Sequence, residues 1–154
     1  MDVELMNMCM IYNAKTNEVV VLDKILKEGW EGLTFPGGHV EEEESFIDSV
    51  IREIKEETDL DIKNPRIKGV IQWIEQGEHK RRSVGILYYT EEFSGLLVEK
   101  NREGDLSWMD WEDFKKAENL SKSMDLCNDI YEGKMKEVLL YFIDGEYQYK
   151  DCFY

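Results

Sequence analysis

The stretch from Gly37 to Leu60, GGHVEEEESFIDSVIREIKEETDL, contains the densest run of charge in the chain and an apolar pattern within it. The apolar residues recur every three to four positions, which is the spacing of one face of an α-helix: Phe46, Ile47, Val50, Ile51 and Ile54. Ser45, with Asp48 three residues later, is typical of a helix N-cap. The stretch therefore predicts an amphipathic helix that packs one face on the rest of the fold.

Carboxylates crowd the same stretch, in which Arg52 and Lys55 are the only Lys or Arg residues. Glu53, Glu56 and Glu57 stand at i, i+3 and i+4, so their side chains share one face of the predicted helix. Like charges at this spacing repel, at a cost of about 0.2–0.5 kcal/mol for each pair. Hard divalent cations such as Mg²⁺ or Mn²⁺ bind carboxylate oxygens and remove the repulsion. Taken alone, the three glutamates indicate either a solvated helix face or a metal site.

The wider spacing of charged and aliphatic residues is more specific than the three glutamates. It resembles the Nudix box, G-x5-E-x7-R-E-U-x-E-E-x-G-U with U aliphatic, at eight of the nine specified positions, namely Gly38, Glu44, Arg52, Glu53, Ile54, Glu56, Glu57 and Leu60. The one departure is Asp59, where the family has glycine. That glycine would end the helix in the left-handed conformation, which Asp adopts at modest cost. We therefore expect a small loss of stability and no loss of chemistry.

The rest of the chain alternates short apolar runs with turn signals, which is typical of an α+β domain. Predicted strands are residues 5–13, 18–24, 33–38, 66–76 and 83–93. The third of these ends in a Pro-Gly-Gly turn, the first two form a hairpin, and Asp144-Gly145 predicts a C-terminal hairpin. Residues 106–114 predict a strand that runs into a helix, and residues 121–133 a second helix. The pattern predicts a mostly antiparallel sheet with two helices packed on it. The resemblance implies one domain over residues 1–154, an α/β/α sandwich around a central mixed sheet.

The resemblance to the Nudix family also implies a reaction, the hydrolysis of a nucleoside diphosphate linked to another group by attack of water on phosphorus. Glu53, Glu56 and Glu57 correspond to the family's ligands for Mg²⁺, for which Mn²⁺ can substitute. The backbone carbonyl of Gly37 or Gly38 is a frequent additional ligand in this family.

Two further residues of the box have positioning roles by the same resemblance. Arg52 is expected to fix one of the metal-binding carboxylates, or Glu44, by a bidentate ion pair. For Glu44 two roles remain open: binding metal through water, or orienting Arg52.

Residues outside the box complete the expected site. In MutT-like members of the family a glutamate from a later loop acts as the general base, which makes Glu103 the candidate, with Asp105 second and Glu56 as the competing base within the box. His39 follows the double glycine and is a candidate phosphate contact, together with Gly37 and Gly38. Asn119 falls where MutT-like enzymes place an Asn that reads a purine edge, but an Asn before a helix is also typical of an N-cap.

Composition limits the partners of the chain. Its 154 residues carry a formal net charge of −15, which argues against nucleic acid and anionic membrane, since Lys and Arg contacts mainly hold both. The three cysteines, Cys9, Cys127 and Cys152, show neither metal-ligand spacing nor an even disulfide set, as expected in a reducing cytoplasm. We expect a small nucleotide as partner and leave open whether the protein is a monomer or a homodimer.

The resulting functional hypothesis is a Mg²⁺-dependent pyrophosphohydrolase that converts a nucleoside triphosphate to the monophosphate and pyrophosphate, with 8-oxo-dGTP as the favoured substrate. The residues that follow the box in hydrolases of diadenosine polyphosphate, ADP-ribose and NADH have no counterpart in this sequence. Their absence favours a nucleoside triphosphate as substrate. A hydrolase of ADP-ribose or a nucleotide sugar is the alternative. A Nudix domain that senses a ligand without turnover is a third possibility, although a sensor has no chemical need for the complete set of box residues.

Overall fold

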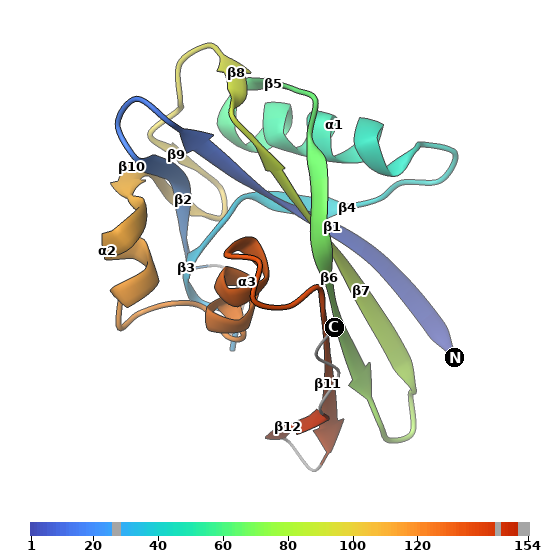
Figure 1. Cartoon of the computed structure of the whole chain (residues 1–154). Coiled ribbons are helices and arrows are strands. Elements are labelled where there is room, and N and C mark those ends of the chain that lie inside the picture. The colour runs from blue at the N-terminus through green and yellow to red at the C-terminus, as the bar shows by residue number, and fades with distance from the viewer. Residues whose placement is uncertain (26–28, 144–145, 151–154) are drawn as a thin grey trace.

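The computed structural model describes residues 1–25, 29–143 and 146–150 (Figure 1). In chain order its elements are β1 (Asp2–Asn13), β2 (Glu18–Lys24), β3 (Gly32–Thr34), β4 (Gly37–His39), α1 (Phe46–Thr58), β5 (Asp61–Lys63), β6 (Arg66–Glu75), β7 (Arg81–Thr90), β8 (Glu92–Ser94), β9 (Lys100–Asn101), β10 (Gly104–Asp110), α2 (Trp111–Lys116), α3 (Met124–Tyr131), β11 (Glu137–Ile143) and β12 (Glu146–Lys150). Among the described residues, no helix combines the length and the apolar character needed to cross a bilayer.

The strands form a large mixed sheet whose order is β12-β11-β6-β7-β1-β2-β10-β9, with β4 paired to β1 and β3 paired to β2. Two of its pairings are parallel, β1 with β7 and β6 with β11, and the others are antiparallel. The predicted hairpins of β1 with β2 and of β11 with β12 are confirmed, although the turn residues Asp144 and Gly145 lie outside the described residues. The central mixed sheet is likewise confirmed.

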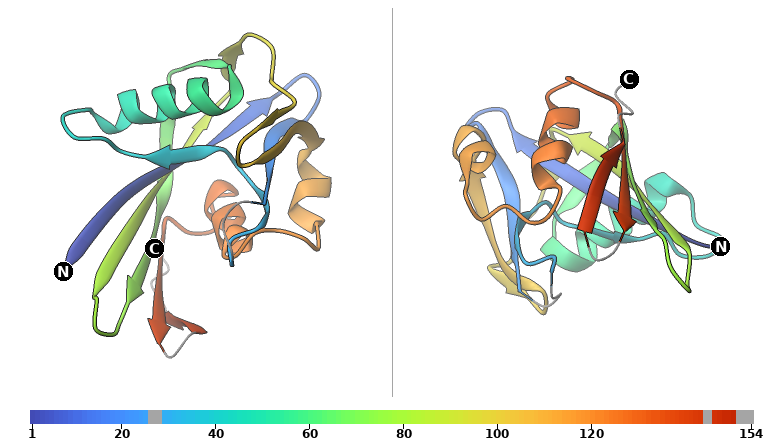
Figure 2. Two further views of the ribbon diagram at one scale, coloured as in Figure 1. Left: turned by 180° about the vertical axis from the view of Figure 1, so that it is seen from behind. Right: turned by 90° about the horizontal axis from the view of Figure 1, so that it is seen from below.

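Alternation of side chains along the central strands creates an apolar layer on each face of the sheet. One layer joins Cys9, Ile11, Val20 and Leu22 to the buried face of α1. The other layer contains the alternate residues of the same strands, whose side chains point to the opposite face of the sheet, and joins them to α2 and α3. Figures 1 and 2 show α1 on one side of the sheet and α2 and α3 on the other. The α/β/α sandwich is therefore confirmed, with three helices rather than two in the part of the chain that the structure describes.

The predicted helix in the acidic stretch is α1, and both of its ends have the expected geometry. The Asp48 backbone N–H donates to the Ser45 hydroxyl at 3.0 Å, which makes Ser45 the N-cap. Asp59 ends the helix with φ 64°, in the left-handed conformation for which the family uses glycine. The apolar pattern is only partly buried, because Phe46 and Ile47 are 43% and 49% exposed. The prediction that the whole stripe packs on the fold is wrong for this first turn.

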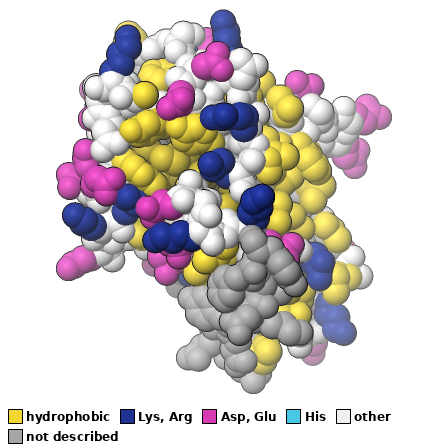
Figure 3. Space-filling model, viewed as in Figure 1, with side chains coloured by type: hydrophobic (Ala, Val, Ile, Leu, Met, Phe, Trp, Pro, Cys, Tyr) yellow, Lys and Arg dark blue, Asp and Glu magenta, His cyan; other side chains and the backbone are white. Residues whose placement is uncertain are grey.

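Acidic side chains dominate parts of the surface. On the face that Figure 3 shows, Asp and Glu gather at the left, over α2, and at the far right, beyond the start of α1, while Lys and Arg are scattered between apolar side chains. The acidic excess is thus largely in contact with water, where salt screens it. The glutamates of the Nudix-like box are the exception, because several of them are partly withdrawn from solvent.

Candidate active site

Two glycines bring the elements of the site into close contact. The prediction that Gly37 and Gly38 form a turn is wrong, because both lie in β4 and pair with Met8 and Asn7 of β1. A Cβ atom on Gly37 would lie 2.0 Å from the Asn7 carbonyl oxygen, and one on Gly38 would lie 2.2 Å from Cδ of Glu53. Glycine is therefore required here by close approach rather than by a turn, and the Glu53 carboxylate lies directly against Gly38. Figure 2 shows β4 running beside α1.

A buried amide ties the same three elements together. The Nδ2 atom of Asn7 donates to the Ser49 hydroxyl on α1 at 2.9 Å, and the Gly38 backbone N–H donates to Asn7 Oδ1 at 3.0 Å. The Gly37 backbone N–H donates to Glu57 Oε2 at 3.0 Å. The sequence interpretation did not select Asn7. The sequence feature that could have identified Asn7 is its position as a polar residue in the otherwise apolar run of β1. A buried amide there must find hydrogen-bond partners.

Arg52 is the centre of a network of charged side chains. Its Nε and Nη2 atoms donate to the two carboxylate oxygens of Glu44 at 3.0 and 2.6 Å, which is a bidentate pair. Its Nη1 atom donates to Glu53 at 3.0 Å and to Glu56 at 3.2 Å. Hydrogen bonds from Arg52, and then from the Glu41 backbone N–H, lower the pKa of Glu44 to about 2. Arg52 therefore gathers three acidic side chains of the box around one guanidinium.

Glu103 lies beside Glu57, although the two are far apart in sequence. Burial, followed by the charge of Glu103 and a hydrogen bond to it, raises the pKa of Glu57 to about 8, and the Glu53 charge adds to the effect. The loop between β9 and β10 holds Glu103 in place, because its backbone N–H donates to Asn101 Oδ1 at 2.8 Å. Asn101 Nδ2 in turn donates to the Glu57 carbonyl oxygen at 3.0 Å. The loop is thus hydrogen-bonded to the last turn of α1.

The donor set suits a hard divalent cation. In the ranges that the structure describes, no three carboxylate, imidazole or thiol groups are already spaced as metal ligands. Glu53 and Glu103 nevertheless lie close enough to Glu57 that, after burial, the repulsion of their charges contributes to its raised pKa. A cation with oxygen ligands would remove that repulsion, so the residues present fit Mg²⁺ or Mn²⁺.

A cavity of about 320 Å³ adjoins these carboxylates. Its lining includes Glu53, Glu57 and Glu103 together with two aromatic residues, Trp30 and Trp73. The two indole rings meet edge to face, with centroids 5.7 Å apart and an interplanar angle of 88°. The volume lies in the range of small-molecule sites in proteins, which runs from about 300 to about 1,000 Å³. The cavity therefore combines an acidic wall with an aromatic one.

The other predicted substrate contacts are placed differently. His39 lines the cavity, but its Nε2 atom contacts a Glu4 carboxylate oxygen at 2.5 Å. Asn119 is exposed and is not among the described residues that line the cavity, and its carbonyl oxygen accepts a hydrogen bond from the Leu33 backbone N–H at 2.9 Å. The alternative that Asn119 caps the following helix is wrong, because Ser123 occupies the N-cap position of α3.

Comparison with known proteins identifies the family and the fold of this chain. The model of the NUDIX domain matches residues 6–127. A Bacillus subtilis protein named "Uncharacterized Nudix hydrolase YvcI" is 36% identical over 103 residues, which is 66% of this chain and 64% of that protein. The match thus spans somewhat less than two thirds of that relative's length.

Solved structures show the same fold. A MutT protein from Bacillus halodurans superposes with a TM-score of 0.73 at 22% identity, covering 94% of this chain and 96% of the other. A MutT NUDIX hydrolase from Burkholderia pseudomallei gives 0.69 at 20% identity, covering 82% and 95%. A bifunctional NMN adenylyltransferase/ADP ribose pyrophosphatase from Francisella tularensis gives 0.63 at 14% identity, covering 85% and 41%. The box residues on β4 and α1, the match to the NUDIX domain and the shared sandwich fold agree. The chain belongs to the Nudix hydrolase family.

Proposed function

We propose that this chain is a divalent-metal-dependent pyrophosphohydrolase that acts as a single domain on a nucleoside triphosphate. The observation that carries the proposal is the grouping of Glu53, Glu57 and Glu103 at the wall of a cavity that also has an aromatic wall. A polyphosphate needs concentrated positive charge, and a nucleobase needs a flat apolar surface. Cations held by the three carboxylates would supply the first, and Trp30 and Trp73 in the lining would supply the second.

Glu53, Glu57 and Glu56, with the backbone carbonyl of Gly38, would hold the metal ions. When bound, Mg²⁺ or Mn²⁺ neutralises the phosphate charge and makes the phosphorus more susceptible to attack. The Gly37 backbone N–H fixes one oxygen of Glu57 and leaves the other for a ligand. Arg52 donates hydrogen bonds to Glu53, which lies against Gly38, and to Glu56, and the bidentate pair with Glu44 fixes Arg52. Glu44 thus acts as the residue that positions Arg52.

Glu103 is the proposed general base. It adjoins Glu57, which would hold metal, and it lines the cavity, so its carboxylate can take a proton from a water that attacks phosphorus. Glu56 suits this role less well, because its side chain is 59% exposed and accepts a hydrogen bond from Arg52. Asp105 is exposed and is not among the described residues that line the cavity.

The favoured substrate class is a purine nucleoside triphosphate, including the oxidised 8-oxo-dGTP. Trp30 and Trp73 support an aromatic base, and the names of two structural neighbours as MutT proteins support this choice. Asn119 stays a proposed contact to the base, although its side chain is exposed and it is not among the described residues that line the cavity. ADP-ribose is the second candidate, supported by the name of the Francisella tularensis neighbour. We also propose that the enzyme acts in the cytoplasm, where the free thiols of Cys9 and Cys127 stay reduced.

A substrate panel in Mg²⁺ tests the proposal, with pyrophosphate and phosphate assayed separately. The panel contains 8-oxo-dGTP, the ordinary nucleoside triphosphates, ADP-ribose and a nucleotide sugar, and the Glu57→Gln variant serves as the blank. Release of pyrophosphate with the highest kcat/KM on a triphosphate supports the assignment. Preference for ADP-ribose or the sugar nucleotide replaces it with the second candidate. Tight nucleotide binding without turnover of any compound would instead identify a ligand-sensing domain.

A further inference from the structure

Arg102 occupies an unusual place beside the carboxylates. It lies in the turn between β9 and β10, is exposed, and lines the cavity described above. It also lines a second, adjoining cavity, whose other described lining residues are Glu53, Glu56, Glu57, Asn101 and Glu103. Arg102 is the one cation in that lining, opposite four carboxylates. Arg102 thus belongs to the lining of both cavities, as Glu53, Glu57 and Glu103 do.

The carboxylates around Arg102 are engaged by other groups. Glu53 and Glu56 accept hydrogen bonds from Arg52, and Glu57 accepts one from the Gly37 backbone N–H. Within the part of the chain that the structure describes, Arg102 itself makes no ion pair. A guanidinium has five N–H donors in a planar fork, and among the described residues those of Arg102 make no hydrogen bond to another group of the chain.

The backbone of Arg102 is held firmly, which distinguishes it from an ordinary surface arginine. Asn101 Oδ1 accepts hydrogen bonds from the backbone N–H groups of Glu103 and Gly104, at 2.8 and 3.2 Å. Asn101 Nδ2 donates to the carbonyl oxygen of Glu57, so the turn is attached to the helix that carries the box. A Cβ atom on Gly104 would lie 1.8 Å from the Asp23 carbonyl oxygen, so β10 starts in tight contact with β2. The turn that carries Arg102 is consequently attached to the helix that carries the proposed metal ligands.

We propose that Arg102 binds the terminal phosphate of the substrate and so selects nucleoside triphosphates over diphosphates. This inference rests on the proposed function, because it assumes that Glu53 and Glu57 hold the phosphates nearer the nucleoside through metal. Guanidinium and phosphate form short, paired hydrogen bonds, and Arg102 shares both cavity linings with Glu53 and Glu57, so it is the described cation placed to take a third phosphate beside those held through metal. The same contact would stabilise the negative charge of the departing pyrophosphate.

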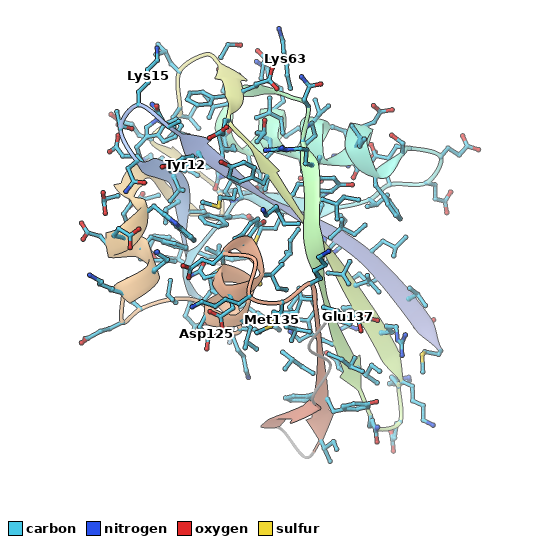
Figure 4. All side chains as sticks on the ribbon, viewed as in Figure 1. Tyr12, Lys15, Lys63, Asp125, Met135 and Glu137 are labelled. Carbon is cyan, nitrogen blue, oxygen red and sulfur yellow. The ribbon has the colours of Figure 1, made fainter. Side chains whose placement is uncertain are left out.

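Arg102 would also have a simpler effect, general electrostatic attraction of the substrate, which must be distinguished from direct binding of phosphate. In a chain of net charge −15, any added cation draws an anionic substrate to the surface, whether or not it touches phosphate. Lys100 is the near control, because it is exposed, lies two residues away and lines neither cavity among the residues described. Lys15 is the distant control, and Figure 4 shows it pointing outward at the turn between β1 and β2. Removing any of the three changes the net charge equally.

The experiment compares Arg102→Gln, Lys100→Gln and Lys15→Gln at 0.15 M salt in Mg²⁺, where long-range steering is largely screened, to about 8 Å. For Arg102→Gln we expect kcat/KM on the triphosphate to fall by about 10- to 100-fold, the loss typical of a removed hydrogen-bonding partner of a charged group. For the corresponding nucleoside diphosphate, kcat/KM should fall much less, so the preference for triphosphate over diphosphate becomes smaller. Arg102→Lys should recover only part of the loss, because an ammonium cannot form the paired contact. Both lysine variants should stay near wild type.

A binding measurement separates failure of this inference from failure of the proposed function. Inorganic triphosphate is titrated into each variant in Mg²⁺ by calorimetry, which needs no turnover. If the wild type hydrolyses triphosphates but Arg102→Gln behaves as Lys100→Gln in both assays, the Arg102 inference is overturned and the function stands. If no nucleotide is hydrolysed but binding of triphosphate depends on Arg102 alone, the function fails and the subsite stands. If neither turnover nor triphosphate binding is seen, both are overturned.

Discussion

The contact between Gly38 and Glu53 permits a quantitative prediction for the Gly38→Ala variant. The added Cβ atom would lie 2.2 Å from Cδ of Glu53, and 2.3 and 2.6 Å from its two oxygens. The carboxylate must therefore move by about 1.2 Å to reach an ordinary contact distance of 3.4 Å. That shift lengthens the 3.0 Å hydrogen bond from Arg52 and displaces a proposed metal ligand.

The expected result is a loss of turnover with little loss of stability. A misplacement of about 1 Å at a reacting centre can lower the rate by about 100-fold. The free energy of unfolding should change by at most about 1 kcal/mol, because a flexible side chain can move aside and alanine restricts the unfolded chain more than glycine does.

Gly37→Ala is the matched control, with the opposite expectation. Its Cβ atom would lie 2.0 Å from the Asn7 carbonyl oxygen and 2.7 Å from the Met8 Cα atom. Backbone atoms inside a sheet cannot move aside, so the free energy of unfolding should fall by about 1–3 kcal/mol or more. Urea unfolding and kcat in Mg²⁺ are measured for both variants. Wild-type kcat and Mg²⁺ dependence in Gly38→Ala, or equal destabilisation of the two variants, would refute the reasoning.

The remaining predictions concern single groups of the site. Because the folded-state pKa of Glu57 is raised to about 8 from 4.5, the folded metal-free protein holds this proton more tightly than the unfolded chain. Its free energy of unfolding should therefore fall as pH rises between those values, and either Mg²⁺ or Glu57→Gln should flatten the slope measured by urea unfolding. Glu103→Gln should lower kcat by about 10²–10⁴-fold with little change in Mg²⁺ affinity by calorimetry, and lost affinity would make it a ligand instead. Asn7→Ala leaves the Gly38 N–H without its acceptor and removes the donor to the Ser49 hydroxyl, which keeps only its hydrogen bond to the Phe46 carbonyl oxygen, so it should destabilise the fold by about 1–3 kcal/mol, a result that unchanged thermal unfolding would contradict.

Local signals explain why α1 could be predicted so fully. The N-cap at Ser45, the periodic apolar residues and the left-handed Asp59 all act within a few residues, and each is readable from the chain. Periodicity identifies which face of the helix is apolar, but not how much of that face other elements cover. This is why the exposure of Phe46 and Ile47 was not foreseen.

Non-local contacts set the parts of the site that the sequence could not supply. Gly37 and Gly38 resemble a turn in sequence, and only the approach of β1 makes them a strand. The meeting of Glu103 with Glu57 depends on the register of β10 with β2 and on the Asn101 hydrogen bonds. Family resemblance pointed to Glu103, whereas residue spacing alone could not.

The attachment of the turn at Asn101 to the helix has a consequence for engineering this protein. Val98 and Asn101 are both hydrogen-bonded to the end of α1, so the chain after Val98 is held in place independently of what precedes it. Residues 95–97 before that anchor include Leu96, which is 86% exposed. We therefore expect residues added at 95–97 to be tolerated, because the groups that carry out the chemistry keep their positions beyond the anchor.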